Sequence, residues 1–123
     1  MAKGDHLYYS FVFDGFPITH HGIDCGDGWV IEFAERQGRN IVTQTPLKDF
    51  YSKGKVYVKS YEKCDHPNIV VGRAAEMFGQ TNYNLFTNNC EHLATYCKTG
   101  TKFSIQISII PNPVINILRF CFS

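Results

Sequence analysis

Apolar and aromatic residues dominate the first third of the chain, in short runs separated by turns that contain glycine. Three of these runs have the length and composition of strands: residues 4–13, 18–25 and 29–33. Asp14-Gly15 is a strong turn signal after the first run, and Gly26-Asp27-Gly28 separates the second run from the third. The pattern predicts a first strand buried on both faces, followed by a hairpin around the Gly-Asp-Gly turn.

The middle of the chain is more polar and ends in an amphipathic segment. Residues 34–55 contain a short apolar and threonine run that stops at Pro46, followed by a turn or a single helical turn. Residues 55–61 alternate and predict another strand, and His66 lies in the loop after it, where we expect it at the surface. In residues 68–79 the apolar positions recur at helical spacing, which predicts an amphipathic helix.

A different pattern surrounds Cys90. Asn88 or Asn89 can cap a helix, because a short polar side chain accepts from the amides of the first turn. With Asn88 as the cap, Glu91 can reach back to the cap amide. Apolar positions then follow at helical spacing up to Gly100, a natural stop. Cys90 is thus predicted in the first turn of a half-buried helix, where the partial positive charge favours the nucleophilic thiolate.

A nucleophile needs a base, and the predicted hairpin supplies a candidate. His20 and Glu32 lie six residues on either side of Gly26, so a tight hairpin brings them across from, or diagonal to, each other. At that distance a carboxylate can orient an imidazole. His21 should point to the opposite face, because strand side chains alternate. Cys90, His20 and Glu32 together match the pattern of a nucleophile, a base and an orienting group.

Composition narrows the class of protein. The 123 residues suffice for one domain, and 44% of them are hydrophobic and 19% charged, with a formal net charge of +1. These values exclude a disordered chain and a strongly basic nucleic-acid binder. The five cysteines form no CxxC pair, so neither a disulfide framework nor a zinc site is indicated, and we expect a reducing, cytoplasmic setting. We expect neither a secretory signal nor a bilayer-spanning segment.

The last part of the chain has a different character. Residues 104–123 are apolar and rich in isoleucine, but Pro111 and Pro113 interrupt them and exclude one continuous helix. Two interpretations stay open. One is a final strand followed by an unstructured tail. The other is an interfacial contact with a lipid surface, since an exposed patch of large apolar residues is seldom left bare.

Three segments of the chain carry a family resemblance: GDHLYY, HHGIDCGDGWVIEF and GRAAEMFGQTNYNLFTNNCEHLATYCKTG. Together they resemble the lecithin retinol acyltransferase-like domain. That family includes small phospholipases and acyltransferases, and it is similar to papain-like cell-wall peptidases in a circularly permuted order. The match covers residues 4–103, and its most specific part is Asn-Cys-Glu-His preceded by a Gly-x-x-x-Tyr-x-Leu run.

The resemblance implies an α+β fold, with a small antiparallel sheet packed against helices in a circularly permuted papain-like arrangement. It implies a catalytic domain over residues 1–103 and an apolar tail over residues 104–123. Cys90 would be the nucleophile and His20 the general base, and a phospholipid or another acyl ester would form an acyl-cysteine thioester. Many animal members have a second histidine where this chain has Glu32. No cofactor or metal is implied, and membrane contact would be peripheral, through the tail.

Three functions stay open on the sequence. The first is a thiol-dependent acyltransferase or a phospholipase A-type lipid hydrolase, and the second is a cysteine peptidase or amidase on the related scaffold. The third is a catalytically silent interaction domain. A lipid enzyme should expose an apolar rim near Cys90, whereas a peptidase should show a polar groove.

Overall fold

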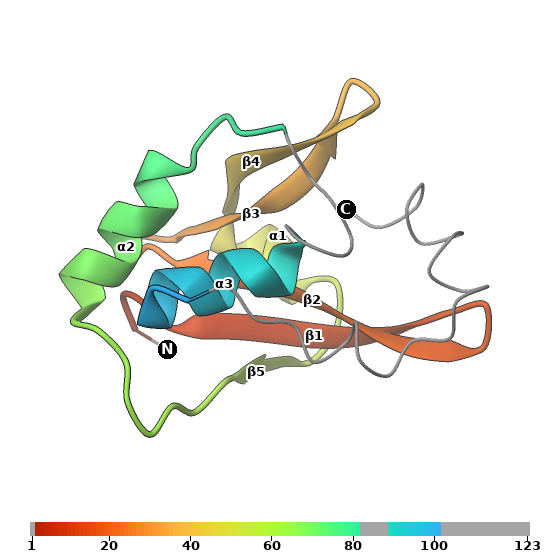
Figure 1. Cartoon of the computed structure of the whole chain (residues 1–123). Helices are drawn as coiled ribbons and strands as arrows, with labels where there is room; N and C mark the ends of the chain where they lie inside the picture. The colour runs from red at the N-terminus through yellow and green to blue at the C-terminus, as the bar shows by residue number, and fades with distance from the viewer. Residues whose placement is uncertain (1, 82–88, 102–123) are drawn as a thin grey trace.

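The computed structural model describes residues 2–81 and 89–101, which form a five-stranded antiparallel sheet and three helices. The strands and helices in chain order are β1 (His6–Phe13), β2 (Phe16–Asp24), β3 (Trp29–Arg36), β4 (Arg39–Pro46), α1 (Leu47–Tyr51), β5 (Val56–Val58), α2 (Pro67–Glu76) and α3 (Cys90–Thr99). The strand order is β4-β3-β2-β1-β5 (Figure 1). The predicted α+β class is confirmed, and the apolar tail at 104–123 lies outside the described residues.

The hairpin of β1 and β2 is set by its turn. Asp14 and Gly15 have φ angles of 51° and 75°, and positive φ at both central positions gives the turn twist that matches the twist of the strands. The pairing then runs without a break from the turn to the far end of β1. It places Tyr9 directly opposite His20, so these two side chains share one face of the sheet.

The pairing of β2 with β3 is much shorter. Within the described chain it covers only Ile23 with Ile31 and Asp24 with Val30, next to the Gly-Asp-Gly turn. Gly22 lies just beyond these pairs, and a Cβ there would come within 2.5 Å of a Val30 methyl carbon. The absence of a side chain at Gly22 therefore lets β3 pack closely against β2 beside the candidate base.

The described residues form two separate apolar clusters. The larger one packs α2 and α3 against β2, β3 and β4, and its members are Ile18, Ile23, Ile31, Phe33, Val42, Val70, Ala74, Met77, Cys90, Leu93, Ala94 and Cys97. The smaller cluster joins Leu7 of β1, Val30 of β3 and Phe50 of α1. Figure 1 shows α3 lying across the sheet with α2 at its side. The start of α3 is therefore held against the middle of the sheet.

Several predicted boundaries differ from the structure, each for a local reason. The run predicted as short is the full strand β4, whose partner is β3 along its whole length. The strand predicted over 55–61 is β5, only three residues long. The helix predicted over 68–79 begins at Pro67 and ends at Glu76, because the backbone of residues 79 and 80 turns to bond both backbone groups of Val42.

Candidate active site

The start of α3 is fixed by a reciprocal cap. The Asn89 side chain accepts from the backbone N–H of His92 at 2.9 Å, and the His92 ring nitrogen Nδ1 accepts from the backbone N–H of Asn89 at 3.1 Å. The prediction that Glu91 closes this box is wrong, because the cap is Asn89 and the third helical residue is then His92. Cys90 is the first residue of the helix, as the sequence predicted.

The Cys90 thiol is fully buried, with no exposed surface. Burial raises the pKa of this thiol, and the charges of Glu91 and Glu32 raise it further. The backbone N–H groups of His21 and Glu91 hydrogen-bond the sulfur and act in the opposite direction. The expectation of a resting thiolate is therefore wrong, because desolvation outweighs the helix start. A neutral thiol must lose its proton as it reacts.

His20 and Glu32 meet as the hairpin predicted. The His20 Nε2 atom lies 2.5 Å from the Glu32 carboxylate oxygen Oε1, and both side chains are buried. The two residues are diagonal rather than directly opposite, because the β2–β3 register pairs Ile23 with Ile31. Glu32 therefore engages Nε2, and Nδ1 is the ring nitrogen on the other side of the imidazole. This is the arrangement in which a carboxylate fixes the tautomer of a histidine base.

Two aromatic rings pack against the imidazole of His20 and restrict its orientation. The Tyr9 ring lies 5.4 Å from the imidazole between centroids, and the Phe50 ring lies 5.9 Å from it. Tyr9 and Phe50 also contact each other edge to face at 5.1 Å. The sequence interpretation missed Tyr9, although a signal was present. A two-residue turn at Asp14-Gly15 already pairs position 9 with position 20.

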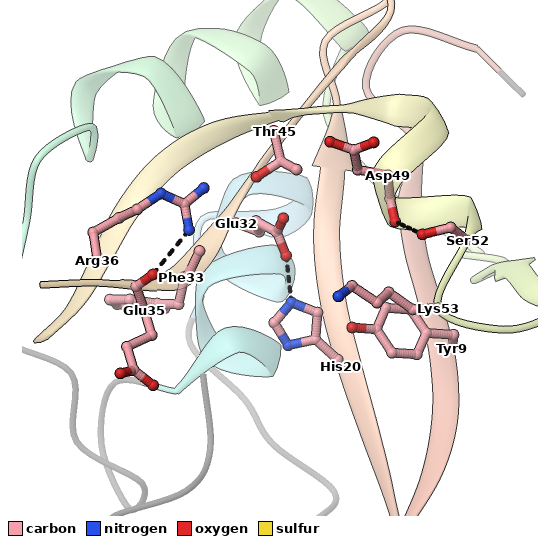
Figure 2. A pocket seen from close by; sticks show the side chains of 11 residues that line it. Tyr9, His20, Glu32, Phe33, Glu35, Arg36, Thr45, Asp49, Ser52 and Lys53 are labelled. Atoms are coloured by element: carbon pink, nitrogen blue, oxygen red, sulfur yellow. Dashed lines mark hydrogen bonds and ion pairs between the residues drawn. The ribbon is translucent and has the colours of Figure 1, made fainter. Parts of the chain in front are cut away.

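A pocket of about 470 Å³ opens beside His20 and Glu32. Its lining residues come from β1, β2, β3, β4 and the α1 region: Tyr9, His20, Glu32, Phe33, Ala34, Glu35, Arg36, Thr45, Asp49, Ser52 and Lys53. Figure 2 shows His20 and Glu32 pointing toward each other in the pocket, with Tyr9 beside the imidazole. Cys90 is not among the lining residues. The pocket thus reaches the candidate base and its carboxylate, and its rim is charged.

His21 takes part in a different arrangement from that of His20. Its Nδ1 atom lies 2.6 Å from His6 Nε2, and its Nε2 atom lies 2.7 Å from the Thr19 hydroxyl. His6 Nδ1 in turn lies 2.7 Å from the Tyr61 hydroxyl. These four residues form what we term the histidine chain. Burial lowers the pKa of His6 to about 3 and lowers that of His21 well below its ordinary value. Both imidazoles are therefore neutral.

Two properties of the described residues bear on other kinds of site. Across residues 2–81 and 89–101, no group of three or more histidine, cysteine or acidic side chains is arranged to hold a metal ion. In the same part of the chain, no helix has the length and apolar character needed to cross a membrane.

Comparison with known proteins gives one consistent family. Among curated proteins, lecithin retinol acyltransferase of Mus musculus is 42% identical over 50 residues, which are 41% of this chain and 22% of the mouse protein. The Homo sapiens protein of the same name is 51% identical over 37 residues, which are 30% of this chain and 16% of the human protein. The chain thus matches less than a quarter of the length of these relatives.

The family model described as lecithin retinol acyltransferase matches residues 1–103, which include β1 to β5, the pocket and the capped start of α3. Because this match covers most of the 123 residues, the chain belongs to the lecithin retinol acyltransferase family.

Proposed function

We propose that this protein is a thiol-dependent acyltransferase or acyl hydrolase that acts on lipid esters, with Cys90 as nucleophile and His20 as general base. The observation that carries the proposal is the buried contact between His20 Nε2 and Glu32 Oε1 at 2.5 Å. Cys90 supports it, because its sulfur accepts from the backbone N–H of His21, the residue next to the proposed base. Membership of the family supports the acyl chemistry.

The proposed first half-reaction forms a thioester. The Cys90 sulfur attacks the carbonyl carbon of the ester, and its proton moves to His20 Nδ1. The tetrahedral oxyanion then collapses, the bond to the alcohol oxygen breaks, and that oxygen takes the proton from His20. In the Michaelis complex we expect His20 Nδ1 to stand about 2.6–4 Å from the sulfur.

The second half-reaction releases the acyl group. Water, an alcohol or an amine attacks the thioester carbon while His20 removes its proton, and the proton returns to the departing Cys90 sulfur. Glu32 acts on His20 throughout. It holds the tautomer with a proton on Nε2, and its charge stabilises the imidazolium that exists between the two proton transfers. The first-turn amides of α3 favour negative charge near the reacting carbon.

A cysteine amidase or peptidase is the second candidate, and one observation favours it. The rim of the pocket carries the charged side chains of Glu35, Arg36, Asp49 and Lys53. A charged rim suits a polar substrate better than an acyl chain. For both candidate functions we propose the same fold, a catalytic domain over residues 1–103 with a circularly permuted papain-like arrangement. We also propose a cytoplasmic setting for both. The free state of the four described cysteines supports that setting.

Intact-protein mass spectrometry tests the proposal directly. Full-length protein is mixed with a short-chain phospholipid below its micelle concentration, and the covalent mass increase of one acyl group is followed over time. We expect peptide mapping to locate it on Cys90. Cys90→Ser should abolish it, whereas Cys97→Ser, at a second buried cysteine of α3, should not.

Two results would contradict the lipid assignment. One is the absence of any acyl adduct together with cleavage of a peptide or amide library. The other is an adduct that forms at the same rate in Cys90→Ser and maps elsewhere. The first result would favour the amidase candidate, because that reaction uses the same residues on a different carbonyl.

A further inference from the structure

The two long hairpins of the sheet end on the same side of the molecule. In an antiparallel meander the β1–β2 turn and the β3–β4 turn lie at one end of the sheet, and the β2–β3 turn lies at the other. Figure 1 shows the β1–β2 turn at the right of the molecule and the β3–β4 turn at its top, both away from α2. The His20 pocket lies between these hairpins, since its lining comes from β1 and β2 on one side and from β3 and β4 on the other.

The tip of the β1–β2 hairpin, residues 11–17, is apolar on both faces. Three half-buried phenylalanines share the face of Tyr9 and His20 by strand alternation and pack against the larger apolar cluster: Phe11, Phe13 and Phe16. On the other face Val12 pairs with Pro17, both are exposed, and 75% of Val12 is accessible. A hairpin that stands in water ordinarily carries polar side chains on its outer face. Since the phenylalanines already pack on the core, it is the exposed pair of Val12 and Pro17 on the outer face that indicates an apolar partner surface.

The tip of the β3–β4 hairpin has the opposite character. Arg36 and Arg39 pair across it, and both are exposed. Arg36 also lines the His20 pocket. The same end of the sheet therefore presents an apolar tip, a pair of cations and, between them, the opening to the candidate base. A phospholipid leaflet offers this combination, with acyl chains beneath a layer of phosphates.

We propose that residues 11–17 together with Arg36 and Arg39 form a bilayer-docking surface, which inserts its apolar tip into an anionic phospholipid leaflet and binds lipid phosphates with its arginines. The proposal deepens the proposed function and rests on it for the identity of the substrate. Five residues separate Gly15 of the turn from His20, which is about 17 Å at the usual strand rise. An insertion of about 5–10 Å, as is usual for interfacial elements, would leave the pocket opening at the headgroup level.

Asp14 limits the depth of insertion. It lies in the turn itself and is the only charged residue among residues 11–17. A carboxylate resists transfer into the acyl region and repels anionic headgroups. Its removal should therefore strengthen docking, whereas an added carboxylate at Val12 should weaken it. The two changes alter the same tip in opposite directions, which a mere loss of folding cannot imitate.

The test is co-sedimentation of the full chain with vesicles of ether-linked phosphatidylcholine and phosphatidylglycerol, which cannot be cleaved at an ester. Val12→Asp should lower the partition coefficient at least about tenfold. The matched control is Ile69→Asp on α2, which is 50% exposed, changes the charge equally and should have little effect. Asp14→Asn should raise partitioning. Arg36→Gln and Arg39→Gln should each lower it about fivefold on anionic vesicles, and should change little on phosphatidylcholine alone.

Equal partitioning of Val12→Asp and Ile69→Asp would overturn the proposal. It would also be overturned if deletion of residues 104–123 abolished binding while Val12→Asp did not, since the tail would then be the lipid contact. A change in sedimentation coefficient on Val12→Asp, without a change in vesicle binding, would assign the tip to a second copy of the chain. Acylation of Cys90 by a soluble ester is measured separately on the unmodified protein. If no acylation occurs, that result contradicts the proposed function and not the docking surface.

Discussion

The histidine chain makes the fold sensitive to acid. His6 and His21 are buried at 0% and 3% exposure, and each hydrogen bond of the histidine chain can be satisfied by two neutral rings. Burial is the main cause of their lowered pKa values, and Lys59 adds to it for both rings. Lys98 of α3 also lowers the pKa of His6. Protonation of either imidazole in the folded protein is therefore opposed by the loss of hydration and by the neighbouring lysine charges.

The sign and size of the effect follow from linkage. In the unfolded chain these histidines titrate near pH 6.5, whereas in the folded protein they stay neutral far below that value. The unfolded state then binds more protons, so stability is full above about pH 6.5 and is lost as the pH falls. The linkage slope of one such histidine is about 1.4 kcal/mol per pH unit, so each should cost the fold roughly 3 kcal/mol over a fall of about two pH units below pH 6.5. Domains of this size have only about 5–15 kcal/mol in total.

The assay is urea unfolding between about pH 7 and about pH 4.5, followed by the fluorescence of Trp29 and by circular dichroism. His6→Gln keeps a donor and an acceptor but cannot titrate, so we expect it to reduce the pH slope of the unfolding free energy by about 1.4 kcal/mol per unit. Ile69→Gln, at a residue of α2 that is 50% exposed and cannot titrate, is the control and should leave the slope unchanged. Equal slopes in the parent protein and in His6→Gln would refute the reasoning.

Three further predictions concern the site itself. Glu32→Gln keeps the shape but removes the charge from a buried hydrogen bond, so we expect acylation to slow at least about tenfold, or about 1.4 kcal/mol; unchanged kinetics with an intact fold would assign the orienting role elsewhere. Iodoacetamide at neutral pH should label exposed Cys64 before buried Cys90, as followed by peptide mass spectrometry, and the reverse order would mean that the thiol is open and ionised. Asn89→Ala removes the cap of α3 and should cost about 1–2 kcal/mol in urea unfolding, whereas Asn68→Ala, at an exposed residue of α2, should cost much less.

Local patterns predicted those parts of the fold that depend on neighbouring residues. The β2–β3 hairpin followed from its Gly-Asp-Gly turn, and with it came the contact of His20 with Glu32. The position of Cys90 at a helix start followed from the adjacent asparagines. The turn in the first case and the helix cap in the second each involve only a few neighbouring residues. Over that range, periodicity and turn chemistry are informative.

The features that the sequence did not predict depend mainly on contacts between distant segments. The histidine chain needs Tyr61, which lies 55 residues from His6 in the sequence, and no local pattern reports that proximity. The protonation state of Cys90 depends on complete burial, which is decided by the packing of α3 on the sheet. The start of a helix does favour a thiolate, but burial of the Cys90 thiol has the larger effect on its pKa. Strand β4 was underestimated because its exposed side chains are polar, while its pairing with β3 is continuous.

The burial of Cys90 also bears on the fate of the acyl group. A thiol without exposed surface or resting charge is a poor target for oxidants, since exposure and ionisation govern the formation of sulfenic acid. The same burial would act on a thioester at Cys90, because water that cannot reach the thioester carbon cannot hydrolyse it. Any acceptor would have to displace the groups that cover Cys90, and an acceptor with its own apolar surface would do so more easily than bulk water. The packing around one side chain would thus set the competition between transfer and hydrolysis.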